Sequence, residues 1–190
     1  QVLIVGRWPP AESQQLSALP GVTGAGSVPD VRPYMARSWI MVVPLRLGGG
    51  TRLKIVESMA AGLPVVSTTV GAQGLDVRDG EELMLADDPQ EFAARCVQLL
   101  RDPGMRQRMA VSGRTLAEQK YSWQRMGERF AEFCYTVAGV DPSADRIAAQ
   151  SRHIPRLGDD AEVAFWDNYL ARRGDASAII GIVGGHEQFK

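Results

Sequence analysis

The fold is decided by the run Trp39-Ile40-Met41-Val42-Val43-Pro44-Leu45, the glycines Gly48-Gly49-Gly50, and the apolar-periodic run from Thr51 to Ala61-Gly62-Leu63-Pro64. In order, these residues predict a buried strand, a glycine loop and a helix of residues 52–61 that Gly62 and Pro64 end. Three glycines let the main chain approach a ligand closely, because they lack a Cβ atom. The start of the helix would offer unpaired N–H groups and a partial positive charge. The segment therefore predicts an anion-binding site on an α/β sheet.

A carboxylate follows the glycines closely, because Glu57 comes less than two helical turns after the start of the predicted helix. A carboxylate only accepts hydrogen bonds, so it suits a ligand that carries hydroxyl groups. The residues alone leave two plainer explanations open. Glycine-rich turns also occur for steric reasons, and Lys54 and Glu57, three positions apart, could form an ordinary exposed ion pair.

Residues 1–138 alternate predicted strands with predicted helices. Asp30, Asp88, Asp102 and Ser122 are typical N-cap residues, and a proline directly follows Asp88 and Asp102. This alternation is typical of the α/β class, and it predicts a Rossmann-like, doubly wound parallel sheet. The predicted strands are residues 2–6, 22–23, 39–45, 65–67 and 83–85, and the predicted helices are residues 12–19, 30–36, 52–61, 89–100, 103–121 and 123–137.

The last of these helices has one apolar stripe, formed by Trp123, Met126, Phe130, Phe133 and Val137. Its helical spacing alone explains these residues, so we expect Trp123 and Phe130 to lie in the core and not to form a substrate platform.

The remaining residues, 141–190, predict a separate helical module or a helical C-terminal extension. Gly139-Val140-Asp141-Pro142 interrupts the pattern and marks the boundary. Val163, Trp166 and Leu170 would share one helical face, and Ile179, Ile182 and Val183 another. No strand is expected in this region.

Composition excludes several classes of protein. The chain has 190 residues, a net charge of −1 and 45% hydrophobic residues, as ordinary globular proteins do, and its charge gives no argument for nucleic acid. Its two cysteines, Cys96 and Cys134, fall on apolar faces of predicted helices and suggest buried, reduced thiols. With no bilayer-long apolar run and no signal peptide, we expect a cytoplasmic location. We also expect a fragment, because a buried strand stands at the first residues.

With the elements in place, a family resemblance becomes visible. The run Val43-Pro44-Leu45-Arg46-Leu47-Gly48-Gly49-Gly50-Thr51-Arg52-Leu53-Lys54-Ile55-Val56-Glu57, continued to Thr68, resembles the donor-site signature of bacterial family 4 glycosyltransferases. Gly26 to Tyr34, Gly71 to Leu75 and Tyr121-Ser122-Trp123 fit other landmarks of that family. The resemblance covers about residues 1–138. It implies the C-terminal, donor-binding half of a retaining enzyme of the GT-B fold that uses a nucleotide-diphosphate sugar.

The resemblance also implies roles for individual residues. Glu57 matches the glutamate that accepts hydrogen bonds from the ribose hydroxyls. The loop of Gly48 and Gly49, with backbone N–H groups of Gly50, Thr51, Arg52 and Leu53, would meet the diphosphate and the donor sugar. Main-chain groups of Ser27 and Val28 would contact the base of a UDP- or GDP-linked donor. Arg46 and Arg52 are candidates for balancing phosphate charge.

Two departures limit what this resemblance implies. The family's other motif glutamate, which reaches hydroxyls of the transferred sugar, falls at Gly49, so the donor sugar stays unassigned. The family's Arg/Lys pair and its acceptor-binding N-terminal domain would lie upstream. We therefore expect no confident catalytic residue here and no transfer by the chain alone. The full-length enzyme would act on a glycan or lipid-linked acceptor in polysaccharide synthesis, with peripheral membrane association.

Metal chemistry is not expected. The chain lacks the Asp-x-Asp pattern by which the other large glycosyltransferase class holds a divalent cation, and His153 and His186 lack partners at ligand spacing.

Two alternative functions stay open. One is a non-catalytic scaffold that binds a nucleotide or a partner. The other is a GT-B-type sugar-nucleotide epimerase, although no histidine precedes His153. The segment from Phe165 to Gly174, with Ile179, Ile182, Glu187 and Phe189, also resembles part of a small helical domain of unknown function.

Overall fold

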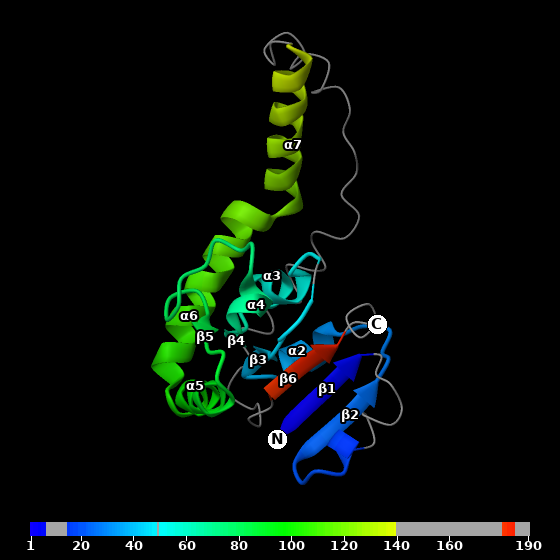
Figure 1. Cartoon of the computed structure of the whole chain (residues 1–190), viewed down its shortest axis with the longest axis vertical. Coiled ribbons are helices and arrows are strands. Elements are labelled where there is room, and N and C mark those ends of the chain that lie inside the picture. Colours follow the sequence, from blue (N-terminus) through cyan, green and yellow to red (C-terminus); the bar gives the residue numbers. More distant parts are fainter. Residues whose placement is uncertain (7–14, 49, 140–179, 185–190) are drawn as a thin grey trace.

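The computed structural model describes residues 1–6, 15–48, 50–139 and 180–184. Six parallel strands form one sheet in the order β2-β1-β6-β3-β4-β5 (Figure 1). The strands are β1 (Val2–Gly6), β2 (Val22–Gly26), β3 (Ile40–Val43), β4 (Val65–Ser67), β5 (Met84–Leu85) and β6 (Ile180–Gly184). The helices are α2 (Arg32–Ala36), α3 (Leu53–Ala60), α4 (Thr69–Ala72), α5 (Pro89–Arg101), α6 (Pro103–Leu116), the π-helix η1 (Ala117–Tyr121) and α7 (Trp123–Ala138).

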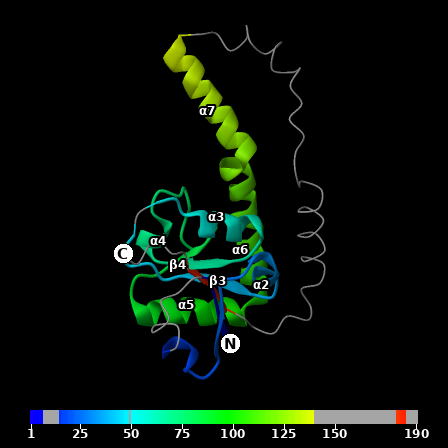
Figure 2. The same ribbon diagram turned by 90° about the vertical axis from the view of Figure 1, so that its right-hand side faces the viewer.

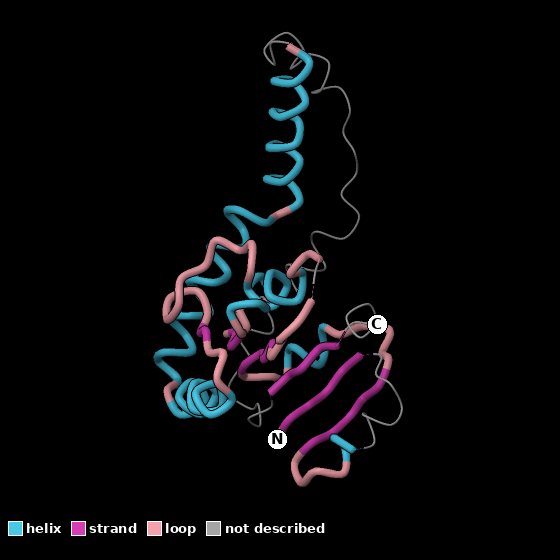
Figure 3. Tube along the Cα trace, in the orientation of Figure 1, coloured by secondary structure: helices cyan, strands magenta, loops and turns pink. Residues whose placement is uncertain are grey.

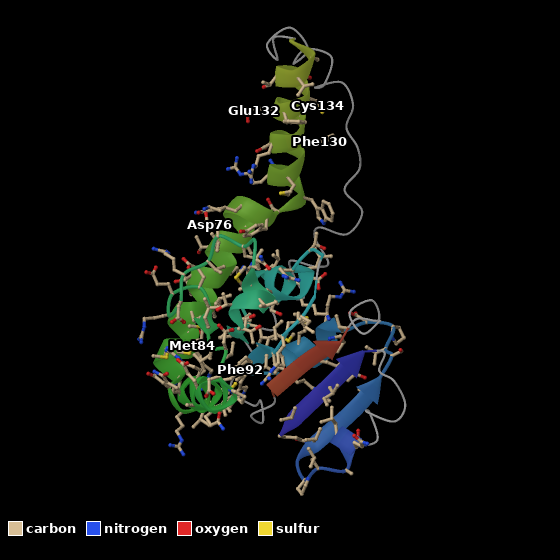
Figure 4. The ribbon with its side chains drawn as sticks, viewed as in Figure 1. Asp76, Met84, Phe92, Phe130, Glu132 and Cys134 are labelled. Carbon is tan, nitrogen blue, oxygen red and sulfur yellow. The ribbon has the colours of Figure 1, made fainter. Side chains whose placement is uncertain are left out.

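Helices cover both faces of the sheet, as the doubly wound prediction requires. All four residues of β3 are buried, and they alternate between two apolar clusters. Met41 and Val43 pack with residues of α2, α3, α4 and η1, whereas Ile40 and Val42 pack with residues of α5 and α6. On the second face, Met84 of β5 and Phe92 of α5 belong to the same cluster (Figure 4). The α/β class and the parallel sheet are therefore confirmed.

Most helix starts agree with the sequence analysis. The Asp88 carboxylate accepts hydrogen bonds from the backbone N–H groups of Gln90 and Glu91 at 2.9 and 3.0 Å. Asp102 and Ser122 cap α6 and α7 in the same way. The prediction for Asp30 is wrong by one residue, because Val31 is the N-cap of α2 and Asp30 instead accepts from the N–H and the side chain of Arg32.

The tail departs from the prediction at one place. Ile180–Gly184, expected to be helical, forms strand β6 between β1 and β3. A short apolar run with β-branched residues fits a buried strand as well as a helix, and periodicity cannot separate the two. Residues 140–179 and 185–190, which include Val163, Trp166 and Leu170, lie outside the described residues. Of the predicted helix 12–19, the structure describes a helical turn at residues 15–17.

Helix α7 projects away from the sheet, and its apolar stripe is exposed (Figures 1 and 2). Trp123 is 89% exposed and Phe130 is 67% exposed, so the expectation that they lie in the core is wrong. Helical periodicity shows that a helix has an apolar face, but not that another element covers it. The structure also places Cys134 on this exposed helix (Figure 4), against the expectation of a buried thiol.

The two thiols should differ sharply in reactivity. Cys96 is buried, and burial raises the pKa of its thiol to about 11, whereas Cys134 is exposed. Because the thiolate is the reactive form, we expect a disulfide reagent at pH 8 to modify one thiol per native chain quickly and the second only after unfolding. The absorbance of the thiolate released by the reagent measures the number and rate of modified thiols. Cys134→Ser is the control variant. Rapid modification of two thiols in the native chain would contradict the burial of Cys96.

Candidate functional site

The glycine loop leaves β3 at the carboxyl edge of the sheet and leads into α3 (Figure 3). On one side of this position the chain runs from β1 to β2, and on the other side it runs from β3 through β4 to β5. Ligands of doubly wound sheets bind outside the carboxyl ends of the strands, where the strand order reverses. Gly48 and Gly50 have φ values of +148° and +94°, which other residues rarely adopt. Gly49 lies outside the described residues.

No side chain of the described residues caps the N-terminus of α3. Arg52 is the N-cap residue, and its carbonyl accepts the N–H groups of Ile55 and Val56 at 3.0 and 3.3 Å. The first N–H groups of a helix have no partner within the helix, so those of Leu53 and Lys54 are open to a ligand. The helix dipole adds a partial positive charge at this end. Together with the glycine loop, this arrangement is suited to an anion.

The Arg52 side chain adds a full positive charge to the same place. Its Nη2 atom donates to the Gly48 carbonyl at 3.3 Å. Its Nε and Nη1 atoms are buried and have no hydrogen-bond partner within the described part of the chain. Buried donors without an acceptor cost free energy, and most such groups in proteins are paired. Arg46, the other arginine considered, is exposed in the same loop.

Glu57 lies on helix α3, four residues after Leu53. This spacing corresponds to about 6 Å along the helix axis, and helical side chains lean toward the N-terminus. The pKa of the Glu57 carboxyl is raised because neighbouring atoms remove part of its water, and the positive charge of Lys54 partly opposes this rise. The same loss of water lowers the pKa of Lys54, and Glu57 opposes that change. The Glu57 carboxylate therefore lies near, but not at, the start of α3.

The predicted nucleobase loop begins at the carboxyl end of β2. Ser27 is exposed there, and Val28 packs against the cluster of Leu3 and Val5. The structure thus places Ser27 and Val28 on the same edge of the sheet as the glycine loop. The strands β1 and β6 lie between the two loops.

The Thr68 hydroxyl, which holds the start of the glycine loop, is not among the predicted site residues. The Thr68 hydroxyl donates to the Leu45 carbonyl and accepts from the Gly71 N–H, which joins the loop after β3 to the start of α4. The Asp87 carboxylate holds the same corner, because it accepts from the N–H and hydroxyl of Thr69 at 2.8 and 2.7 Å. A threonine before a short helix is a recognisable N-cap signal, but the tie to Leu45 requires the folded chain.

Gly71 has to be a glycine for steric reasons. A Cβ atom there would overlap the Ser67 hydroxyl and lie 3.1 Å from the Val43 carbonyl oxygen. We expect Gly71→Ala to lower the free energy of unfolding by about 1–3 kcal/mol through overpacking. Gly127→Ala on α7, where a Cβ atom would meet no described residue within 4 Å, should instead raise it by about 0.5–1 kcal/mol. Urea unfolding measures both, and equal effects of the two substitutions would contradict this account.

Neither a metal cluster nor a membrane-crossing helix occurs in the described part of the chain. No group of three His, Cys, Asp or Glu side chains in these residues could hold a metal ion. No helix among the same residues is both long and apolar enough to cross a membrane.

The fold places the chain in the α/β class, with a doubly wound parallel sheet, and comparison with known proteins gives its family. Residues 1–102 match the family described as glycosyl transferases group 1. The chain therefore belongs to the group 1 glycosyl transferases.

This chain matches only part of the length of its named relatives. The phosphatidyl-myo-inositol mannosyltransferase of Mycobacterium leprae is 33% identical over 147 residues, which is 73% of this chain and 38% of that protein. The D-inositol 3-phosphate glycosyltransferase of Acidothermus cellulolyticus is 38% identical over 111 residues, 56% of this chain and 23% of that protein. A solved C-terminal domain of a group 1 glycosyl transferase (LpcC) from Francisella tularensis is 21% identical, with a TM-score of 0.49 over 64% of this chain and 86% of that domain. The chain thus spans well under half of these two relatives.

Proposed function

We propose that this chain binds the nucleotide-diphosphate sugar of a retaining glycosyltransferase. The single observation that carries the proposal is the Arg52 side chain beside the start of α3: its Nε and Nη1 atoms are buried and have no hydrogen-bond partner among the described residues. A cation and several N–H groups that converge on one place, on glycine-lined backbone, suit a diphosphate. Membership of the group 1 glycosyl transferases supports a sugar nucleotide as the molecule that carries this diphosphate.

The remaining parts of the donor fit around this diphosphate position. Glu57, about 6 Å further along α3, would accept hydrogen bonds from the ribose diol. The loop at Ser27 and Val28 would meet the base, which is uracil or guanine. Gly49 offers no side chain to the transferred sugar, so main-chain groups of Gly48, Gly50 and Thr51 would have to contact it. No metal is required for this mode of holding the phosphates.

Transfer itself would need a second half of the enzyme that binds a glycan or lipid-linked acceptor. Sugar transfer depends on acceptor and donor being held together with water excluded. The curated relatives that this chain matches are much longer than the matched region. Polysaccharide synthesis at a membrane surface would be the setting of such an enzyme.

Calorimetric titration tests this proposal directly. We expect UDP or GDP to bind this chain at least about tenfold more tightly than the matching nucleoside, because the nucleoside lacks the diphosphate that Arg52 and α3 would hold. We expect no sugar transfer by the chain alone from UDP- or GDP-sugars. Absence of binding by both nucleotides would overturn the donor-site assignment and favour a partner-binding scaffold.

A further inference from the structure

Helix α7 carries an apolar stripe that no described element covers. The exposed residues of this stripe are Trp123, Met126, Phe130, Phe133 and Val137. Among the described elements, only η1, at the base of the helix, contacts α7 extensively, and no residue of α7 is buried. Figures 1 and 2 show the helix projecting away from the sheet, and Figure 4 labels Phe130 on it. A helix of 16 residues is only marginally stable in water by itself, so α7 gains stability when its apolar face is packed.

The spacing of the stripe is typical of two helices that pack against each other. Its residues follow one another at intervals of three, four, three and four positions. An average interval of about 3.5 residues keeps one narrow line of side chains facing a second helix, whereas a helix on the core of a globular domain usually has a wider apolar face. The positions beside this line hold mostly small residues, Ser122, Gly127, Cys134 and Thr136, with Arg129 as the one charged residue. A second helix can therefore approach the stripe closely.

The area of the stripe is large enough for a specific contact between two copies of the chain. Trp123, Phe130 and Phe133 are 89%, 67% and 64% exposed. Because an aromatic side chain buries roughly 150–250 Å², these three residues would remove roughly 300–500 Å² per copy from water. With Met126 and Val137 added, two copies together would bury about 1,000 Å², which is the lower limit for a specific protein interface.

The charges of α7 favour a protein partner over a membrane surface. Away from the stripe, the helix carries Arg125 and Arg129 together with Glu128 and Glu132, so its net charge is zero. The Arg125 Nη1 atom is paired with Glu128 Oε2 at 3.0 Å. Helices that lie on membranes are instead typically rich in Lys and Arg on their polar face, because these residues attract anionic lipids.

We infer that the stripe of α7 is the contact surface for a second copy of this chain, whose own α7 packs along it in a dimer. A twofold axis brings the same patch of two copies together, so one apolar stripe is sufficient to form both sides of the contact. Each α7 then shields the aromatic side chains of the other from water. This inference does not depend on the proposed function, because none of the predicted donor-site residues lies on α7.

Sedimentation velocity of the full 190-residue chain over a range of concentrations tests the contact. We expect a monomer–dimer equilibrium with a dissociation constant on the order of 10 μM, because the interface lies at the lower end of the size range. Phe130→Glu should raise this constant at least about tenfold, since it places a charge within the apolar contact. Ala131→Glu adds the same charge at an exposed position outside the stripe and should leave the constant unchanged.

Two results would overturn the inference. One is a wild-type chain that stays monomeric well above the expected dissociation constant, including a monomer that binds phosphatidylcholine vesicles, with or without phosphatidylglycerol, through Phe130. The other is a Phe130→Glu variant that dimerises as tightly as the wild-type chain. At concentrations where both are monomeric, the two chains should unfold at the same temperature, because Phe130 is exposed in the single chain. If Phe130→Glu does not fold, Trp123→Ser takes its place in the same measurement.

Discussion

Replacing Arg52 by alanine is expected to weaken binding of UDP or GDP by roughly 10- to 100-fold while leaving the chain as stable as before, or more stable. Hydrogen bonds to charged groups contribute about 1.5–3 kcal/mol each, and 1.4 kcal/mol is a tenfold change in affinity. In the free chain, however, the Nε and Nη1 atoms of Arg52 are buried and find no acceptor in the part of the chain that the structure describes. Their removal eliminates an unfavourable desolvation, so affinity and stability should change in opposite directions.

The pair of measurements is calorimetric titration with the nucleotide and thermal unfolding without it. Arg101→Ala is a suitable control, because it removes the same charge from the last turn of α5. That helix begins after the carboxyl end of β5, so its last turn lies toward the opposite edge of the sheet. An unchanged dissociation constant for Arg52→Ala, or a marked loss of thermal stability, would show that Arg52 serves the fold and not the ligand.

Replacing Glu57 by alanine is expected to abolish the preference of the chain for a ribonucleotide over a 2′-deoxyribonucleotide. We expect the wild-type chain to prefer UDP or GDP over the matching 2′-deoxy form by about tenfold, because a carboxylate that accepts from both hydroxyls of the ribose loses one of these bonds. The absolute affinity is a weaker readout, since removal of a negative charge near a diphosphate partly offsets the lost bonds. The ratio of the two dissociation constants is therefore compared between the wild-type chain and Glu57→Ala. This double-mutant cycle, with one change in the protein and one in the ligand, isolates the contact between Glu57 and the 2′-hydroxyl.

The same ratio should depend on pH in a defined direction. In the proposed contact the carboxylate form of Glu57 would accept from both hydroxyls. The pKa of this carboxyl is raised because surrounding atoms remove water, with Lys54 opposing the rise. The ribose preference should therefore disappear as the pH falls through a value above the ordinary glutamate pKa. Glu57→Gln, which cannot titrate, should show no such step. A pH step of equal size in this ratio for Glu57→Gln would show that a group other than Glu57 titrates.

Much of the sheet could be predicted from the sequence, because its strands and helix starts carry local signals. Strand β4, the helix start at Asp88 and the stop at Gly62 each follow from the residue types at those positions. Strand β6 could not be predicted, since five apolar and glycine residues fit two kinds of buried element. Only the pairing of residues 180–184 with β1 and β3, far away in sequence, distinguishes them.

The candidate site shows the same limit. The glycine loop and Glu57 are visible as a motif, and the sequence resemblance gave each a role. The sequence does not show that two nitrogens of Arg52 are buried without a partner among the described residues, nor that Thr68 bonds to Leu45, because both facts depend on how the loops pack. The exposure of Phe130 and Cys134 on α7 could not be predicted from the sequence either, because a helical stripe has the same spacing whether or not another element covers it.

The bond from Thr68 to the Leu45 carbonyl also bears on the thermodynamics of binding. It anchors the start of the glycine loop to a buried strand end, so this part of the loop is ordered before any ligand arrives. A preorganised site loses little conformational entropy when it is filled, and more of the gross interaction energy then appears as affinity. Thr68→Val, of nearly equal volume, should therefore make nucleotide binding entropically less favourable, with a smaller change in its enthalpy. The rigidity of the corner at Thr68 would in this way set part of the strength with which a donor is held, although Thr68 itself does not need to touch it.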